Sequence, residues 1–289
     1  GLASLVRGRA RHALLLGASY AFYASWSAPF VLLLVYSTFL DFVCGKRIAG
    51  ARTRATRLAW LWLSLIGNLG VLFYFKYGNF FLDNVAFVSG VDPEPFYLDV
   101  VIPLGISFYT FQSMSYSLDM YRGDGEPCES FLDFALYVTF FPQLIAGPIL
   151  RAAEFLPQLS RTEPVSEREV LAGVELFLLG LFKKVVVADN LAVLADQVFA
   201  SPLEYSGAAV SLATTATMAQ GLALLLGFSL PRNFDYPQLR HNPILYRRSW
   251  HITMGNWFTD YVYKPLGGSR VGDARFAFNI MVTWTLLGL

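Results

Sequence analysis

The stretch from Leu58 to Phe81 is the feature that most limits the folds open to this chain. Residues 58–75 carry no charged side chain, and Lys76 follows them directly. About 20 mostly apolar residues are enough to cross the hydrocarbon core of a bilayer, and a lysine near the end of such a segment can extend its amine to the interface. We therefore predict a membrane-spanning helix here.

Other apolar stretches are distributed along the rest of the chain. They cover 13–44, 100–120, 131–150, 170–200, 208–230 and 275–289. Of the 289 residues, 55% are hydrophobic and 15% are charged, whereas a soluble domain has about 25% charged residues. This composition excludes a disordered chain, a collagen and a nucleic-acid-binding domain. It predicts an all-α, polytopic transmembrane bundle, in which the amphipathic segment 250–266 forms a re-entrant or interfacial helix.

Basic clusters flank the first apolar stretch on both sides. They contain Arg7, Arg9 and Arg11 before it, and Lys46, Arg47, Arg52, Arg54 and Arg57 after it. Because cytoplasmic loops carry an excess of basic residues, a hairpin broken near Pro29 would place both clusters inside. We expect one domain over residues 1–289. A start at Gly1 and an end within the apolar run 280–289 predict a fragment truncated at both ends.

The chain has three histidines, and only one of them is a candidate for chemistry. His12 lies in the basic entry to the first apolar stretch and is predicted to be interfacial, and His241 lies in a turn-rich, solvated loop. His251 precedes an aromatic segment, and an ionisable residue at membrane depth is a functional candidate, with an interfacial position beside Trp250 as the alternative. Cys44 and Cys128 lack metal-ligand spacing and are expected to be small apolar fillers.

The other charged residues within apolar regions have competing interpretations. Asp260 is nine residues after His251, so the two side chains would face apart on one straight helix, and pairing with Arg247, Arg248 or Lys264 is the simpler interpretation. The group Lys183, Lys184 and Asp189 could line a transport pathway. No repeat relates the two halves of the chain, whereas many transporters have one.

Three consecutive motifs late in the chain resemble one protein family. They read RNFDYP at 232–237, SWHITMGNWF at 249–258 and TDYVYKPLGG at 259–268. Earlier motifs, in the same order as in that family, read PLGISFYTFQ at 103–112, DMYRG at 119–123 and FFPQLIAGPI at 140–149. The set is similar to the membrane-bound O-acyltransferase (MBOAT) family, and within it to the AlgI-like branch that serves alginate O-acetylation. The likeness covers residues 18–289.

The resemblance implies an O-acyltransferase that moves an acetyl group from a cytoplasmic donor, acetyl-CoA, toward a polysaccharide hydroxyl outside the cytoplasm. It implies no metal and no resident cofactor, and it makes His251 a catalytic residue. Residues expected to shape the site are Trp250, Asp260, Arg151, Trp257 and Tyr261. The family's second histidine, its general base, falls beyond Leu289, so this chain alone is expected to be inactive.

The resemblance also implies a setting and some alternatives. The setting is the bacterial inner membrane, with a multi-pass chain, a periplasmic acetyltransferase partner, polysaccharide-synthesis machinery and no nucleic acid. D-alanyl transfer to teichoic acid by a sister branch is one alternative, although that branch generally lacks the turn 265–268. A non-catalytic scaffold and a transporter are the others. The chain departs from the family pattern by a residue inserted at Ser249 and by a short stretch lost before Gly221.

Overall fold

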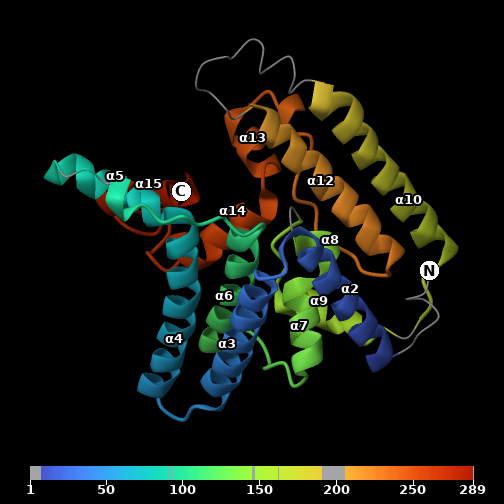
Figure 1. Cartoon of the computed structure of the whole chain (residues 1–289), viewed down its shortest axis with the longest axis horizontal. Helices are drawn as coiled ribbons and strands as arrows, with labels where there is room; N and C mark the ends of the chain where they lie inside the picture. The colour runs from blue at the N-terminus through green and yellow to red at the C-terminus, as the bar shows by residue number, and fades with distance from the viewer. Residues whose placement is uncertain are drawn as a thin grey trace. The chain divides into compact units, whose positions relative to one another are not determined.

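The computed structural model describes residues 8–90, 92, 94–144, 147–161, 163–190 and 206–288. Helices joined by turns and loops make up this part of the chain, and no β-strand occurs in it (Figure 1). The predicted all-α class is therefore confirmed for these residues. They divide into two compact units, an N-terminal unit of residues 8–144 and 151–159 and a C-terminal unit of residues 147–150 and 160–288.

The N-terminal unit is a helical bundle. Its helices are α2 (Arg9–Ser27), α3 (Val31–Gly50), α4 (Arg54–Leu72), η1 (Phe73–Tyr77), α5 (Gly78–Ser89), η2 (Glu94–Phe96), α6 (Ile106–Arg122), α7 (Phe131–Thr139), α8 (Phe141–Leu144) and α9 (Ala152–Leu159). The helices α3, α4 and α6 pack together, and α7 packs on α2 and α3. The predicted break near Pro29 is confirmed, because the chain reverses direction between α2 and α3 (Figure 1).

The helices α4, η1 and α5 join into one helical run, Arg54–Ser89. It is the one stretch of the described chain that is long and apolar enough to cross a membrane. The predicted span, which ended at Phe81, is too short, since the helix continues to Ser89 and ends where Gly90 adopts a φ of +70°. Glycine tolerates this left-handed conformation, which commonly ends helices. The position of the glycine, and not that of the last apolar residue, therefore determines where the helix ends.

A buried carboxylate links three helices of this bundle. The fully buried side chain of Asp41, on α3, accepts hydrogen bonds from Ser64 and Asn68 of α4 and from Ser117 of α6. The Asn68 Nδ2 to Asp41 Oδ2 distance is 2.7 Å, and the Ser117 Oγ to Asp41 Oδ1 distance is 2.9 Å. Because buried polar groups are costly unless they are bonded, this network fixes how α3, α4 and α6 meet.

Replacing Asp41 by alanine is expected to destabilise the folded protein by about 3 kcal/mol, because three buried donors lose their acceptor. Thermal unfolding in detergent micelles measures the change. Asp124→Ala, at an exposed position in the loop after α6, is the matched control and should unfold like the wild type. Equal unfolding temperatures for the two variants would contradict a structural role for the network.

His12 was predicted to be interfacial, but its side chain is buried within the N-terminal unit. Its Nδ1 lies 2.6 Å from Asp133 Oδ1, and its Nε2 lies 3.2 Å from the backbone oxygen of Leu159. Both partners are acceptors, so the ring donates to both only when it carries both protons. The prediction failed because the sequence does not show that α2 brings His12 against α7 and the end of α9. Cys44 is buried and Cys128 half-buried, and both are free thiols.

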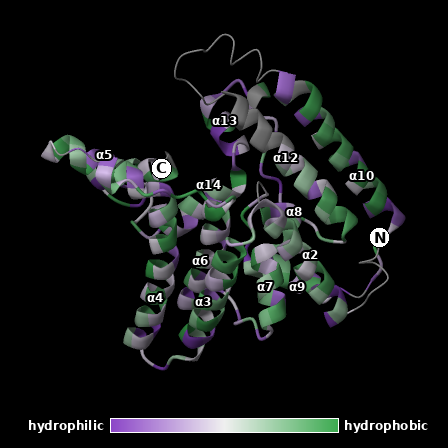
Figure 2. Ribbon diagram, in the orientation of Figure 1, coloured by the Kyte–Doolittle hydropathy of each residue, from purple (hydrophilic) through white to green (hydrophobic). Residues whose placement is uncertain are grey.

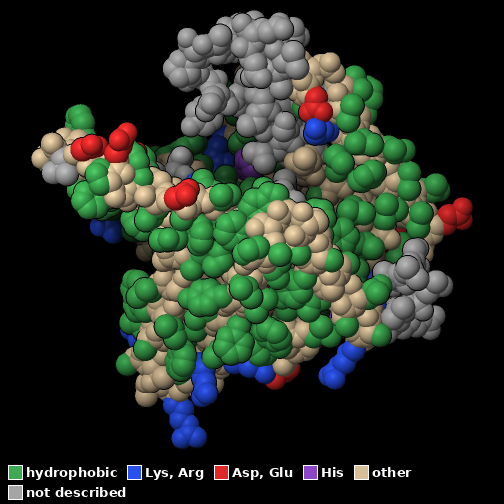
Figure 3. Space-filling model, in the orientation of Figure 1, with side chains coloured by type: hydrophobic (Ala, Val, Ile, Leu, Met, Phe, Trp, Pro, Cys, Tyr) green, Lys and Arg blue, Asp and Glu red, His purple; other side chains and the backbone are tan. Residues whose placement is uncertain are grey.

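The surface of the N-terminal unit is largely apolar, with charges at the ends of its helices. Hydrophobic side chains cover the face over α3, α4 and α6 in Figure 3, and Figure 2 shows the same character along α4. Lys and Arg side chains project near the turn between α3 and α4, whereas acidic side chains lie over α5 (Figure 3). The helical run Arg54–Ser89 is therefore basic at one end and acidic at the other.

The C-terminal unit combines three long helices with several short ones. Its helices are α10 (Glu167–Phe182), η3 (Lys183–Ala188), α12 (Ser206–Leu225), η4 (Pro237–Leu239), α13 (Pro243–Ser249), α14 (Ile252–Phe258), η5 (Thr259–Tyr263) and α15 (Asp273–Gly288). The part of the predicted helical pattern 170–200 that follows residue 190 lies outside the described residues. The predicted turn 265–268 is confirmed, with positive φ angles at Gly267 and Gly268.

Two glycines allow α10 and α12 to pack closely. A Cβ atom on Gly221 would lie 2.7 Å from the backbone oxygen of Gly173 and would also meet the backbone nitrogen of Phe177. Such separations are too short for any side chain, so the two backbones touch. Small residues at helix crossings are characteristic of membrane proteins, where the packing of backbones replaces hydrophobic burial as the source of association.

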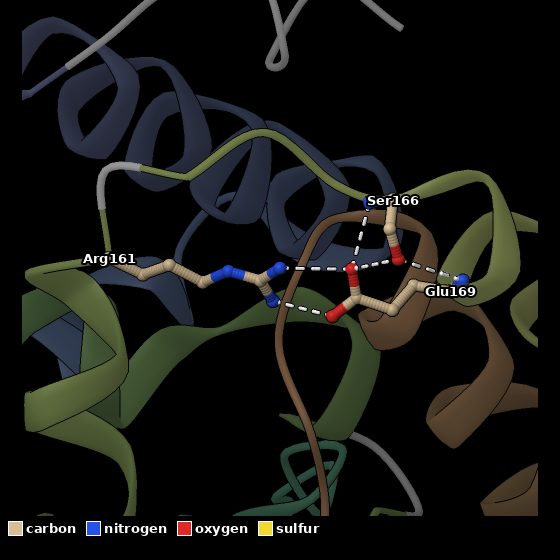
Figure 4. A network of polar contacts seen from close by, with 3 residues as sticks. All are labelled: Arg161, Ser166 and Glu169. Carbon is tan, nitrogen blue, oxygen red and sulfur yellow. Dashed lines mark hydrogen bonds and ion pairs between the residues drawn. The ribbon is translucent and has the colours of Figure 1, made fainter.

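Ser166 and Glu169 form a capping box at the start of α10 (Figure 4). The Ser166 hydroxyl accepts from the Glu169 backbone N–H, and the Glu169 carboxylate accepts from the Ser166 backbone N–H at 2.8 Å. Arg161 adds a two-pronged ion pair to the same carboxylate, with distances of 2.6 and 2.9 Å. These contacts precede the apolar stretch that begins at Val170.

The pH dependence of stability tests this cap. Hydrogen bonds from Arg161 and Ser166 lower the pKa of Glu169 from 4.5 to about 2. A carboxyl whose folded pKa is lowered stabilises the fold above its unfolded pKa, and this contribution disappears as the pH falls from about 4.5 to about 2. Glu169→Gln keeps a capping side chain but should remove that part of the pH dependence. Unfolding curves between pH 2 and 7 measure it, with Glu175→Gln on the exposed face of α10 as the control.

Candidate functional site

His251 occupies the junction between the short helices α13 and α14, neither of which is long enough to span a membrane. Asn242 caps the start of helix α13, because its side chain accepts from the Ile244 backbone N–H at 2.8 Å. His251 itself is 8% exposed and has a φ of +44°. Residues other than glycine rarely adopt this left-handed conformation, and strain of this kind clusters at functional sites.

Asn233 holds this junction together from the loop after α12. Its backbone oxygen accepts from the Ile252 N–H at 2.8 Å, and its side-chain oxygen accepts from the Thr253 N–H at 3.2 Å and the Thr253 hydroxyl at 2.9 Å. Its amide nitrogen lies 3.4 Å from His251 Nδ1. Sequence reasoning missed Asn233 as a site residue, although the motif at 232–237 contains it. The sequence feature that could have identified Asn233 is its position next to Phe234 in that motif.

Aromatic rings and one arginine set the environment of the histidine. The centroid of the His251 ring lies 4.6 Å from that of Phe234 and 5.6 Å from that of Trp250, and both contacts are edge-on. Burial, and to a smaller extent the positive charge of Arg247, lower the pKa of His251 from 6.5 to about 4. The imidazole is therefore neutral at physiological pH, so it is available for hydrogen bonding as an uncharged ring.

A cavity of about 340 Å³ lies alongside α14. Its polar lining comes from Arg247, Arg248, Asn256, Thr259, Tyr263 and Thr283. The guanidinium of Arg247 lies 5.3 Å from the ring of Trp284, and a Cβ on Gly255 would lie 2.8 Å from Arg247 Nη1. The absence of a side chain at Gly255 thus lets Arg247 lie against α14. Two guanidinium groups in a half-apolar cavity suit a ligand with both apolar and anionic parts.

The remaining predicted site residues fall into three groups. Trp257 and Tyr261 are buried in the C-terminal unit with their ring centroids 5.0 Å apart, and Trp250 stacks on Tyr246. Asp260 pairs with Lys264 at 2.6 Å, one of the partners expected from the sequence. Arg151 precedes α9 and belongs to the N-terminal unit, so its part in the site stays a prediction.

The residues that could have lined a transport pathway have partners within the C-terminal unit. Lys184 Nζ lies 2.8 Å from Asp189 Oδ2, and Lys183 Nζ lies 5.0 Å from the centroid of the Tyr236 ring. All three belong to or adjoin the π-helical segment η3. The pairing explains how these charges are tolerated in an apolar region.

Fold and site together define a class of protein. It is a helical protein in which a buried histidine lies in a strained junction, and the two short helices on either side of that junction help to line a cavity that contains two arginines. The sequence model of the membrane-bound O-acyltransferase family matches residues 60–232. The chain belongs to this family.

Relatives with curated names narrow the comparison. The "Probable alginate O-acetylase AlgI" of Pseudomonas aeruginosa is 41% identical over the whole of this chain and 58% of its own length. The "Peptidoglycan O-acetyltransferase" of Helicobacter pylori is 33% identical over 94% of this chain and 58% of its own length. The "Teichoic acid D-alanyltransferase" of Bacillus subtilis is 24% identical over 63% of this chain. The chain thus spans little more than half the length of the first two relatives.

Proposed function

We propose that this chain belongs to an O-acyltransferase that moves an acetyl group from acetyl-CoA, on the cytoplasmic side, toward a polysaccharide hydroxyl on the other side of a bacterial inner membrane. The acceptor is the polymer itself or a periplasmic partner acetyltransferase. The observation that carries the proposal is the buried, neutral His251 in a strained junction, with the arginine-lined cavity next to α14. The names of the relatives, an alginate O-acetylase and a peptidoglycan O-acetyltransferase, support acetyl transfer to a polysaccharide.

The site supplies two of the requirements of acyl transfer. A hydrogen-bond donor must stabilise the oxygen of the acyl carbonyl as it gains negative charge, and His251 is a neutral group of the right type. Water must be kept away from the activated acyl group, and the apolar walls of the junction, Phe234 and Trp250, serve this purpose. The base that accepts the hydroxyl proton is assigned, by the resemblance, to a second histidine in the full-length protein.

Charge asymmetry supports a membrane orientation. The basic end of the helical run Arg54–Ser89 lies in the cytoplasm, because positive residues favour that side, and the acidic end over α5 lies outside. The glycine crossing of α10 and α12 supports further spans in the same membrane. A multi-pass protein of this kind has access to donor and acceptor on opposite sides.

Four observations rank the alternatives below this proposal. The turn 265–268, which the D-alanyl-transferring branch generally lacks, is formed here, and the teichoic acid relative is the most distant of the three. Lys184 pairs with Asp189, so these charges neutralise each other within the unit, and a transport pathway is not needed to explain them. A scaffold without catalysis would leave the strained His251 junction without a purpose.

An acetyl-transfer assay tests the proposal. Inner-membrane vesicles containing the full-length protein and the polymer-synthesis machinery are supplied with acetyl-CoA labelled in its acetyl group. Label is expected in the polysaccharide, and vesicles without the protein should leave the polymer unlabelled. Equal labelling with and without the protein, or labelling only when a D-alanyl carrier replaces acetyl-CoA, would refute the proposed reaction.

A further inference from the structure

The hydrogen bonds of Asn233 fix the orientation of its side-chain amide. The Thr253 backbone N–H can only donate, and it points at the amide oxygen of Asn233 at 3.2 Å. The Thr253 hydroxyl accepts from the Ile149 N–H at 3.0 Å and therefore has its own proton to give to the same oxygen, at 2.9 Å. Turning the amide over would place two donors face to face. The amide nitrogen of Asn233 therefore faces the histidine.

This orientation determines which nitrogen of His251 carries the proton. An amide NH₂ group has no acceptor capacity, so His251 Nδ1, 3.4 Å away, has to present its lone pair. The proton of the neutral ring is then on Nε2. A second proton on the ring would bring an Nδ1–H against the amide NH₂ group, and the nearby positive charge of Arg247 opposes it as well.

We propose that Asn233 is a positioning residue that holds His251 as its Nε2–H tautomer, so that His251 donates a hydrogen bond to the reacting acyl carbonyl and does not act as a base. This inference rests on the proposed acetyl transfer. His251 neither gains nor loses a proton in the reaction, and the proton of the attacking hydroxyl goes to another base. The rings of Phe234 and Trp250 help to hold the imidazole, because both lie edge-on to it.

The tautomer can be observed without any activity measurement. Full-length protein containing histidine labelled with ¹⁵N in its ring is studied by solid-state NMR in lipid, and the His251 signals are identified by their absence in His251→Gln. The wild type is expected to show an unprotonated Nδ1 and a protonated Nε2. Asn233→Asp offers an acceptor in place of the donor, so the proton should move to Nδ1. A wild-type spectrum with the proton on Nδ1 would overturn the inference.

Activity then tests whether His251 serves as a donor. Glutamine places an N–H group near the position of Nε2 but has no basic nitrogen. We expect His251→Gln to retain acetylation within about tenfold of the wild type, while His251→Ala loses about 100-fold, as for an oxyanion donor. Asn233→Asp should lose about 10- to 100-fold, as do substitutions that disturb the orientation of a working histidine. If His251→Gln is as inactive as His251→Ala although both fold, the donor role is refuted.

Matched controls separate these effects from general damage. His241→Gln changes the exposed histidine of the preceding loop, and Asn84→Asp changes an exposed asparagine on α5. Both should acetylate polymer at the wild-type rate. Failure of the proposed function and failure of this inference are distinguishable, because the NMR spectrum reports the tautomer even when no acetyl transfer occurs.

Discussion

Full-length protein carrying His251→Ala is expected to lose polymer O-acetylation by at least about 100-fold, because a transition state loses the group that stabilises its developing charge. The substitution also removes a ring packed between Phe234 and Trp250. The acetyl content of polymer made by cells that express the variant measures the loss, and the rate of label transfer in vesicles confirms it. Acetylation at the wild-type level would remove His251 from the mechanism.

The loss of activity is informative only when the variant is folded and inserted. The amount of protein in the membrane fraction and its thermal unfolding in detergent show this. His241→Ala is the matched control, since His241 is exposed in the loop before α13. It should acetylate polymer as well as the wild type does.

Gly221→Val is expected to destabilise the folded protein strongly. The first carbon of any side chain at this position meets backbone atoms of Gly173 and Phe177, which cannot move aside as the end of a flexible side chain can. The two helices have to separate, at a cost of about 3 kcal/mol for an overpacked site. Thermal unfolding in detergent and resistance to proteolysis measure the change.

A second glycine provides the control for this variant. Gly17, on α2, has open space where a Cβ would lie. Gly17→Ala should leave stability unchanged or raise it by about 0.5–1 kcal/mol, because alanine is the better helix former. If Gly221→Val and Gly17→Ala unfold at the same temperature, α10 and α12 do not pack through their glycines.

The sequence predicted local features well, because neighbouring residues determine them. The break near Pro29 depends on the proline itself. The turn at 265–268 follows from two glycines after a proline. In contrast, the predicted membrane-spanning helix ended too early, at Phe81. The prediction rested on apolar side chains, but a helix can continue beyond its apolar residues, and this one continues up to Gly90.

Features that join distant segments were missed. Asp41 is the only charged residue between residues 13 and 44, a signal that could have marked it, but its partners on α4 and α6 become apparent only when the helices pack. His12 was assigned to the interface because α7 and α9, which bury it, lie far along the chain. Asn233 was within a motif already noticed, yet its role depends on the direction of its hydrogen bonds to Thr253 and His251, which no sequence pattern shows.

The π-helical segment η5 has a consequence for evolution and engineering. A π turn is wider than an α turn and accommodates one additional residue without breaking the helix. Deleting one residue from Thr259–Tyr263 would remove the wide turn and restore a regular helix, and the residues after it would keep nearly the same rotation about the helix axis. The turn 265–268 and α15, which contributes Thr283 and Trp284 to the cavity wall, would stay in place, whereas the part of the wall formed by Thr259 and Tyr263 would shift. A single deleted codon in η5 should therefore be tolerated by the fold and reshape one side of the cavity, whereas in a regular α-helix it would rotate every following residue by about 100°.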